Sequence, residues 1–300
     1  MKCFKVMLCA VLLFLVGGPQ MGLAKVQKDR ESSATMSVNF FSESLQKEMQ
    51  MSVYLPPHYN AQDKYPVLYV LHSYTVNESQ WFNTLKITET ADDLISSGKI
   101  EPMIIVAPRI NNSFGVNSSD VSGYSAASGK PEDAGVLHTG RYEDYIAKDV
   151  VEFVDTHFNT IKSRHARYLG GTSMGGFAAL HIGFKHPEVY GKVGGHSPAL
   201  FIGDMWEPLE KLVFPNAEAR ANNDPLALAA SRKLNKLSIY LDYGDQDDFK
   251  AANEKLDGIL KGAKTKSYEL HVTPGGRHDD AYWSSQLENY LLFYGGFDRD

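Results

Sequence analysis

The feature that most constrains the fold is a succession of short, nearly continuous apolar runs separated by segments with helical periodicity. These runs lie at residues 67–71, 103–107, 167–169, 237–241 and 268–272. Strands that are apolar on both faces are typical of a parallel sheet with helices packed on both sides. The pattern therefore predicts an α/β fold with a mostly parallel central sheet.

The chain before Pro56 has a different pattern. Two extended stretches, residues 35–41 and 48–55, precede Pro56, and the second alternates apolar and polar side chains. Alternation with a period of two suits a half-buried antiparallel strand, and the proline pair ends it. We expect these two stretches to form an antiparallel hairpin that opens the sheet.

Three segments have the spacing of amphipathic helices: residues 141–157, the stretch from Ser173 to Pro187, and residues 281–294. Two others are irregular. Residues 111–138 are rich in Ser, Asn, Gly and Asp and are too long for an ordinary connection, which predicts a functional loop or a disordered segment. Residues 201–231 carry three prolines and predict a cap or surface insertion.

The first 24 residues have the layout of a secretory signal peptide. Lys2 and Lys5 precede an apolar run at residues 6–16, and a small-residue cleavage site ends at Ala24. The apolar run of roughly eleven residues is too short for the ~20 that a bilayer span needs. We therefore expect a signal peptide over residues 1–24, one domain over residues 25–300, secretion or export to the periplasm, and no membrane span after cleavage.

The composition narrows the chemistry. Both cysteines, Cys3 and Cys9, lie in the predicted signal peptide, so the mature chain would carry neither disulfides nor a catalytic thiol. Losing that segment changes the formal net charge from −6 to −8, which gives no support for a nucleic-acid partner. The spacing of acidic and histidine residues fits neither an EF-hand nor a zinc site, and we expect no metal and no cofactor.

The pentapeptide Gly171-Thr172-Ser173-Met174-Gly175 follows one of the short apolar runs and precedes an apolar helix. Such a pattern occurs by chance in many chains, but a strand-turn-helix setting holds a serine exposed on a sharp turn. Glycines are needed there because a side chain would collide with the neighbouring backbone. Ser173 is therefore the predicted nucleophile of an acyl-transfer enzyme.

A serine nucleophile needs a histidine base, and the histidine needs a carboxylate, which in α/β-hydrolases follow in the order serine, acid, histidine. Among the downstream histidines only His278 follows a strand in a loop, whereas the others lie in predicted helices or strands: His181, His186, His196 and His271. Four aspartates crowd the loop after residues 237–241: Asp242, Asp245, Asp247 and Asp248. The position relative to Gly244 favours Asp247, with Asp248 next and Asp245 third.

Acyl transfer also needs donors for the oxyanion of the tetrahedral intermediate. One donor is expected from the main-chain amide of Met174, directly after the nucleophile. The second is expected from the loop after residues 67–71, and we choose the amide of Tyr74. His72 in the same loop precedes Ser173 and ends a buried run, so we interpret it as a structural histidine.

Several stretches together resemble the esterase D branch of the α/β-hydrolases, whose members include S-formylglutathione hydrolases, feruloyl and acetyl-xylan esterases, siderophore esterases and mycolyltransferases. The matching stretches are residues 53–57, 65–72, 171–176, 196–200 and 275–283. The resemblance implies the α/β-hydrolase fold, with Ser173 as nucleophile, Asp247 as acid and His278 as base.

The chain departs from that branch in two places. Ser73 stands where the family usually has glycine in the oxyanion loop, which removes backbone freedom and bears on the choice of Tyr74. Near the base, Arg277 separates the glycines from His278, and Asp280 takes a place that is often aromatic. These changes bear on substrate fit or on catalytic strength.

The sequence thus predicts a secreted serine esterase that acts through an acyl-enzyme on acylated carbohydrate, aryl or siderophore-type esters. Three aromatic residues are candidates for a substrate site: Trp81, Tyr124 and Trp283. Two alternatives stay open, an acyltransferase that uses the same acyl-enzyme and a catalytically silent binding protein. The sequence leaves the acyl group, the alcohol and the oligomeric state undetermined.

Overall fold

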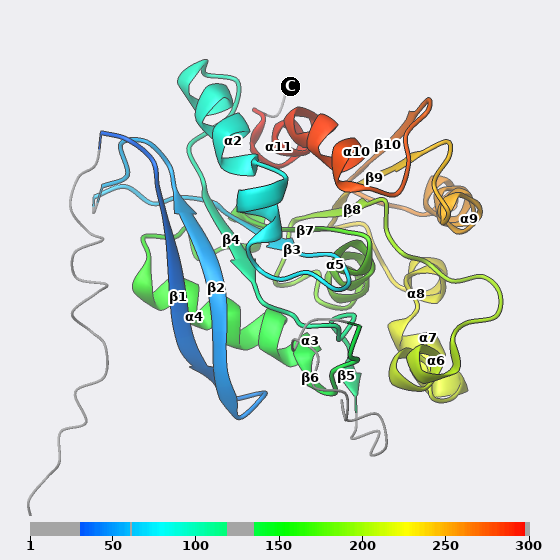
Figure 1. Cartoon of the computed structure of the whole chain (residues 1–300). Coiled ribbons are helices and arrows are strands. Elements are labelled where there is room, and N and C mark those ends of the chain that lie inside the picture. The colour runs from blue at the N-terminus through cyan, green and yellow to red at the C-terminus, as the bar shows by residue number, and fades with distance from the viewer. Residues whose placement is uncertain (1–30, 61, 119–134, 298–300) are drawn as a thin grey trace, which may run out of the picture.

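The computed structural model describes residues 31–60, 62–118 and 135–297 (Figure 1). The predicted signal peptide of residues 1–24, with Ala24 and both cysteines, lies outside the described residues. So does Tyr124, one of the three aromatic candidates for the substrate site. The prediction of a single domain over residues 25–300 stays a prediction.

An eight-stranded sheet forms the centre of the molecule (Figure 1), in the order β1-β2-β4-β3-β7-β8-β9-β10. Six of its strands run parallel: β3 (Val67–Leu71), β4 (Ile104–Pro108), β7 (Arg167–Thr172), β8 (Lys192–His196), β9 (Ser238–Gly244) and β10 (Ser267–Thr273). The hairpin of β1 (Ala34–Ser42) and β2 (Lys47–Leu55) adds antiparallel to β4. The predicted sheet and its opening hairpin are thus confirmed.

The five apolar runs predicted as strands leave out β8, although its last residue, His196, is predicted to lie in a strand-like stretch, because the sequence of β8 contains Gly194 and Gly195. Glycine has no side chain to pack and is uncommon inside strands. Here the strand needs it, since a Cβ at Gly194 would collide with the hydroxyl of Tyr294. The requirement comes from a residue a hundred positions away and is not visible in the local sequence.

Helices cover both faces of the sheet (Figure 1) and enclose two apolar cores. One core lies against four helices: α4 (Val150–His157), α5 (Met174–Lys185), α8 (Pro225–Ser231) and α9 (Lys250–Gly262). The other lies against α2 (Ile87–Ser96), α10 (Asp280–Ser285) and α11 (Leu287–Gly295). The structure divides the single helix predicted over residues 281–294 into α10 and α11, which meet at Gln286.

The remaining elements are short. The helix predicted over residues 141–157 begins as α3 (Tyr142–Asp144) and passes through the π-helical turn η2 (Tyr145–Asp149) before α4. The predicted irregular segment 111–138 contributes β5 (Asn117–Ser118), which pairs with β6 (Gly140–Arg141). The predicted cap contains α6 (Glu207–Val213), α7 (Ala217–Asn223) and α8. The π-helical turn η1 (Gln80–Thr84) follows β3, and the short 3-10 helix η3 (Arg164–Ala166) precedes β7.

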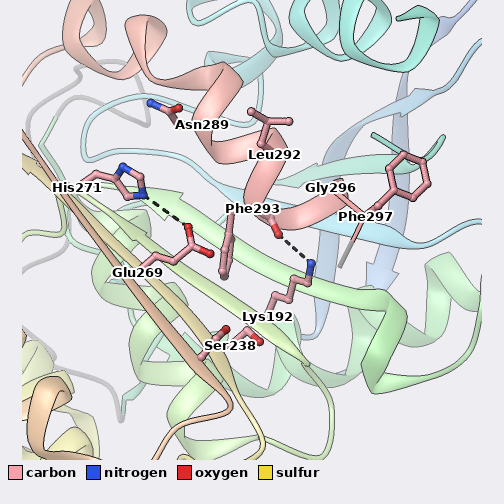
Figure 2. Close-up of a pocket in the computed structure, with 10 residues that line it drawn as sticks. Lys192, Ser238, Glu269, His271, Asn289, Leu292, Phe293, Gly296 and Phe297 are labelled. Atoms are coloured by element: carbon pink, nitrogen blue, oxygen red, sulfur yellow. Dashed lines mark hydrogen bonds and ion pairs between the residues drawn. The ribbon is translucent and has the colours of Figure 1, made fainter. Parts of the chain in front are cut away.

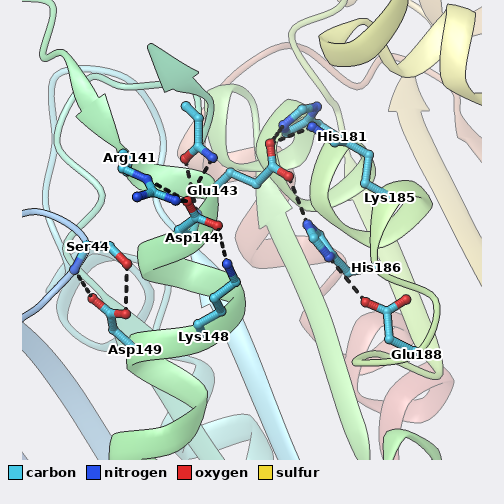
Figure 3. A network of polar contacts seen from close by, with 11 residues as sticks. Ser44, Arg141, Glu143, Asp144, Lys148, Asp149, His181, Lys185, His186 and Glu188 are labelled. Carbon is cyan, nitrogen blue, oxygen red and sulfur yellow. Dashed lines mark hydrogen bonds and ion pairs between the residues drawn. The ribbon is translucent and has the colours of Figure 1, made fainter. Parts of the chain in front are cut away.

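The buried carboxylate of Glu143, in α3, connects α3 to α5 (Figure 3). Glu143 lies 3.1 Å from Nε2 of His181, 2.6 Å from Nζ of Lys185 and 2.8 Å from Nε2 of His186. Burial raises the pKa of Glu143, but the hydrogen bonds and charges of these three partners outweigh it and hold that pKa well below its ordinary value. His181 and His186 are thereby engaged in a structural network, away from the position expected for the base.

Candidate active site

Ser173 lies on the turn between β7 and α5, where its backbone has φ 54° and ψ −117°. This conformation is strained for a residue with a Cβ. The flanking glycines allow the turn to close, since a Cβ at Gly171 would meet the carbonyl of Gly175 and one at Gly175 would meet the carbonyl of Leu71. The sequence-based reason for both glycines therefore agrees with the structure.

His278 brings the predicted nucleophile and the predicted acid together. Its Nε2 lies 2.8 Å from Oγ of Ser173, and its Nδ1 lies 3.2 Å and 3.1 Å from the two carboxylate oxygens of Asp247. An ionised carboxylate only accepts hydrogen bonds, so Nδ1 carries the proton and Nε2 is left to accept from the serine hydroxyl. In this arrangement His278 can remove the proton of Ser173.

Of the three candidate acids only Asp247 reaches His278. Its carboxylate is buried and also accepts hydrogen bonds from the amide of Phe249, at 2.7 Å, and from the hydroxyl of Ser197. Burial raises the pKa of Asp247, but these bonds and the contact with His278 lower it further than burial raises it. Asp245 and Asp248 are exposed.

The fourth aspartate belongs to a separate buried network. Asp242 accepts a hydrogen bond from Nδ1 of His196 at 3.0 Å and from the hydroxyls of Tyr282 and Tyr290 at 2.6 Å and 2.9 Å. His196 also lies 3.0 Å from the hydroxyl of Tyr294. The network is buried, which fits a structural role for Asp242 and His196.

The amides of Met174 and Tyr74 are the predicted oxyanion donors. Within the part of the chain that the structure describes, no hydrogen bond occupies either amide, whereas the amides on both sides of Tyr74 are occupied. Ser73 N–H donates to Gln80 and Thr75 N–H donates to Asn112, each at 2.8 Å. His72 is buried and accepts from the amide of Ile110 at 3.0 Å, as a structural histidine would.

A pocket of about 630 Å³ opens beside Ser173 and His278. Its walls are mainly aromatic and aliphatic, and its polar residues lie near the oxyanion loop and the base. The apolar wall consists of Tyr74, Val76, Phe114, Met174, Ala199, Phe201, Trp206, Leu209, Phe249 and Trp283, and the polar part of Ser73, Thr75, Gln80, Asp279 and Asp280. The pocket is thus mainly apolar, and its acidic and basic side chains are confined to Asp279, Asp280 and the neighbouring His278.

Two of the three aromatic candidates fall within the described residues, and they differ. Trp283 lines the pocket and packs edge-on against the ring of His278, with centroids 5.1 Å apart. Trp81 does not line it, which corrects the prediction. Its indole N–H donates to the carbonyl of Leu71 at 3.0 Å, and this bond holds the ring in the core, at 1% exposure.

Sequence reasoning missed most of the apolar wall. Phe201 and Trp206 belong to the predicted cap, and Phe114 belongs to the predicted irregular loop. An aromatic residue in an otherwise polar, irregular segment is the local signal that was available, because such residues lack a regular element to pack in. The ring of Phe249, which follows the acid loop, packs at a tilt against the ring of His278 with centroids 4.9 Å apart.

A second cavity, of about 350 Å³, lies where β8, β9 and β10 begin, at the sheet edge opposite Ser173 (Figure 2). Lys192 points toward the end of α11 and donates to the carbonyls of Phe293 and Tyr294, at 2.9 Å and 3.1 Å. Its ammonium is thus already engaged. Parallel sheets place their sites at the carboxyl ends of the strands, so this cavity lies on the wrong edge for the predicted chemistry.

Two further observations concern the described residues as a whole. None of their helices has both the length and the apolar character needed to cross a bilayer. No three of their His, Cys, Asp and Glu side chains form a group arranged to bind a metal ion.

The chain is similar to curated and solved esterases. An endo-1,4-beta-xylanase/feruloyl esterase of Xylanibacter ruminicola is 28% identical over 268 residues, which are 87% of this chain and 31% of the relative. This chain therefore spans about a third of that relative.

Among solved structures, a ferulic acid esterase superposes with a TM-score of 0.71 at 24% identity, covering 89% of this chain and 99% of the other. An S-formylglutathione hydrolase of Agrobacterium tumefaciens gives 0.68 at 20%, covering 89% and 96%. A ferulic acid esterase of Anaeromyces mucronatus gives 0.67 at 19%, covering 88% and 92%. These neighbours have the α/β-hydrolase fold, and this chain shares it.

A family model described as "Putative esterase" matches residues 42–294. The match begins at the end of β1 and ends in α11, so it spans both Ser173 and His278. The chain belongs to this esterase family.

Proposed function

We propose that this protein is a secreted serine esterase that hydrolyses carboxylic esters through an acyl-enzyme. The observation that carries the proposal is the hydrogen-bonded series Ser173–His278–Asp247 at the mouth of an apolar pocket. Membership of an esterase family supports the same reaction class. A silent binding protein would have no need to keep a strained serine within 2.8 Å of a histidine base.

The reaction proceeds in two halves. Oγ of Ser173 attacks the ester carbonyl carbon while Nε2 of His278 takes the hydroxyl proton, and the amides of Met174 and Tyr74 donate to the oxyanion. The bond to the alcohol oxygen then breaks as His278 returns the proton to it. In the second half His278 deprotonates a water molecule, which attacks the acyl-enzyme; the bond to Oγ of Ser173 then breaks as His278 returns the proton to it, and the carboxylic acid is released. Asp247 stabilises the imidazolium in both halves.

The pocket supports an aryl acyl group. Six aromatic side chains line it: Tyr74, Phe114, Phe201, Trp206, Phe249 and Trp283. Rings of this kind favour a flat aromatic acid by stacking and edge contacts, each of which contributes about 0.5–1.5 kcal/mol beyond burial. The similar proteins that are feruloyl esterases support a carbohydrate-linked hydroxycinnamoyl ester. Asp279 and Asp280 at the polar end disfavour anionic substrates such as glutathione thioesters.

The test is hydrolysis of an ester panel by the mature chain: methyl ferulate, a feruloylated xylo-oligosaccharide, acetylated xylan, a short-chain nitrophenyl ester and a catecholate siderophore. The Ser173→Ala variant is the control for every substrate. We expect the highest kcat/KM with the feruloyl esters and a loss of at least about 10⁴-fold in the variant. A fluorophosphonate probe that labels neither chain would contradict the proposed nucleophile.

Export is part of the proposal and rests on the sequence of residues 1–24. Expression of the full chain, followed by N-terminal sequencing of the exported product, tests it. A mature chain that begins at Lys25 supports signal cleavage after Ala24, and retention of residues 1–24 on an unexported chain contradicts it.

A further inference from the structure

Gln80 links three loops of the candidate site. It is buried at 3% exposure on η1, between the oxyanion loop that follows β3 and the loop that carries His278. We infer that Gln80 is a positioning residue: its side-chain amide fixes the direction of the Tyr74 amide and couples the oxyanion loop to the base. The inference rests on the proposed esterase function.

The acceptor end of Gln80 controls the oxyanion loop. Its Oε1 accepts from the amide of Ser73 at 2.8 Å, and Asn112 accepts from the amide of Thr75 at 2.8 Å. The peptide groups on both sides of Tyr74 are therefore anchored, while its own amide has no hydrogen-bond partner among the described residues. A donor must be in place before the oxyanion forms in order to stabilise it without reorganisation.

The donor end of Gln80 reaches the base loop. Its Nε2 donates to Oδ1 of Asp280 at 2.8 Å and to Oγ of Ser73 at 3.2 Å. Oγ of Ser73 in turn lies 2.8 Å from Oγ1 of Thr172, the residue before the nucleophile. Gln80 thus binds the oxyanion loop and Asp280, two residues after His278, and is linked through Ser73 to the end of β7 just before Ser173.

The orientation of this amide is fixed by its partners. An N–H group of the backbone only donates and an ionised carboxylate only accepts, so Oε1 must face Ser73 and Nε2 must face Asp280. A glutamate at this position keeps the acceptor and loses the donor, and a leucine loses both.

The same contacts join two separated positions of the chain. Ser73 and Asp280 both bind the side-chain amide of Gln80, so the three residues form one polar arrangement that anchors the oxyanion loop through side chains.

The experiment compares the parent with Gln80→Leu and Gln80→Glu, and with Gln286→Leu as the matched control. Gln286 is also a buried glutamine, at 8% exposure, but its side chain binds Ser285 and Asn289 outside the pocket. The readouts are kcat and KM for the best ester of the panel. A third readout is the inhibition constant of the matching trifluoromethyl ketone, which forms a tetrahedral adduct with the serine and carries an oxyanion.

For Gln80→Leu we expect kcat to fall about 10- to 100-fold, part of the loss seen when an oxyanion donor is deleted. KM should change by less than about threefold, and the inhibition constant should rise by the same factor as kcat/KM falls. Gln286→Leu should leave all three values at those of the parent. For Gln80→Glu the loss should shrink between pH 8 and pH 5, because protonation gives the introduced carboxyl a donor for Asp280.

The inference is overturned if folded Gln80→Leu keeps the kcat and the inhibition constant of the parent. It is equally overturned if kcat falls while the inhibition constant does not change, or if only KM rises, which would make Gln80 a substrate contact. If Gln80→Leu does not fold, a pH-independent activity ratio of Gln80→Glu to the parent overturns it. A parent chain with no esterase activity refutes the proposed function instead.

Discussion

The hydroxyl of Ser197 donates a hydrogen bond to Oδ2 of Asp247, the same oxygen that lies 3.1 Å from Nδ1 of His278. The amide of Phe249 holds the other oxygen at 2.7 Å. The carboxylate is therefore fixed from three sides, and the ring it faces has one favourable orientation. A rigid acid of this kind keeps Nε2 of His278 aimed at Ser173 between turnovers.

Removing the Ser197 hydroxyl should weaken this arrangement. In Ser197→Ala we expect kcat to fall on the order of 3- to 10-fold, since one of the bonds that orient the acid is lost. The pKa of Asp247 should rise, because that bond helps to lower it. A lowered carboxyl pKa contributes stability that is lost as pH falls through the folded value, so acid unfolding of the variant should begin at a higher pH. Thermal melts from pH 2 to 7 measure this, and identical curves would contradict it.

The assignment of the acid is tested by two neighbouring aspartates. Asp247→Asn should lower kcat about 10⁴-fold because the amide stabilises the wrong histidine tautomer, whereas Asp248→Asn at an exposed position should retain parental kcat. Steady-state kinetics on one feruloyl ester distinguishes the two. Full activity of Asp247→Asn would remove Asp247 from the mechanism.

The Glu143 network predicts a pH-dependent stability. Glu143→Gln should lower the free energy of unfolding by about 2–3 kcal/mol near neutral pH, because it leaves the half-buried Lys185 and His186 without a counter-charge and removes an acceptor from His181. The pKa of Glu143 is lowered, so its contribution is complete above the ordinary value of 4.5 and declines in acid. The hydrogen bond to Glu143 raises the pKa of His186, whose contribution is complete below 6.5 and declines as pH rises through its folded value.

The deficit of Glu143→Gln should therefore be largest between about pH 4.5 and 6.5. Urea unfolding at pH 3.5, 5.5 and 8 measures it. Glu188→Gln, at an exposed position beside His186, is the control and should change stability by less than about 0.5 kcal/mol. A deficit that is equal at all three pH values would argue against the charge-based account.

Trp206 at the pocket mouth predicts substrate selectivity. Trp206→Ala should raise KM for a feruloyl ester about 3- to 10-fold by removing an aromatic contact, with little effect on an acetyl ester too short to reach it. Phe297→Ala is a matched control, since both side chains are 57% exposed but Phe297 lines the cavity at the opposite edge. Equal effects on both esters would place Trp206 outside the acyl site.

The sequence predicted the order of the elements well because the sheet is buried on both faces. Residues 67–71, for example, are apolar and buried at every position, which is the pattern of a strand covered on both faces. It did not define β8, of which only His196 is predicted to be strand-like, because the contact with Tyr294 selects glycine there. It also missed the break at Gln286 within residues 281–294, which leaves the apolar spacing almost unchanged.

The residues of the candidate site also differ in whether the local sequence indicates them. Ser173, Asp247 and His278 each directly follow a strand or lie in the loop after one, so local pattern and chain order are enough to propose them as candidates, and their side chains lie within hydrogen-bonding distance of one another. Gln80, Phe114 and Trp206 come from segments without periodicity, and only the folded chain brings them to one pocket. The prediction that Trp81 contributes to the substrate site was wrong. Its neighbour Gln80 lines the pocket, whereas the ring of Trp81 lies in the core, and the local sequence does not distinguish the two directions.

The pocket wall contributed by Phe201, Trp206 and Leu209 belongs to the segment that crosses from β8 to β9, whereas Ser173, Asp247 and His278 lie in the turn or loops that follow β7, β9 and β10. Substitutions in this wall can therefore change which esters fit the pocket without changing the proposed triad. During evolution, insertions or exchanges in the segment between β8 and β9 would alter which esters are accepted, while Ser173, Asp247 and His278 could stay the same.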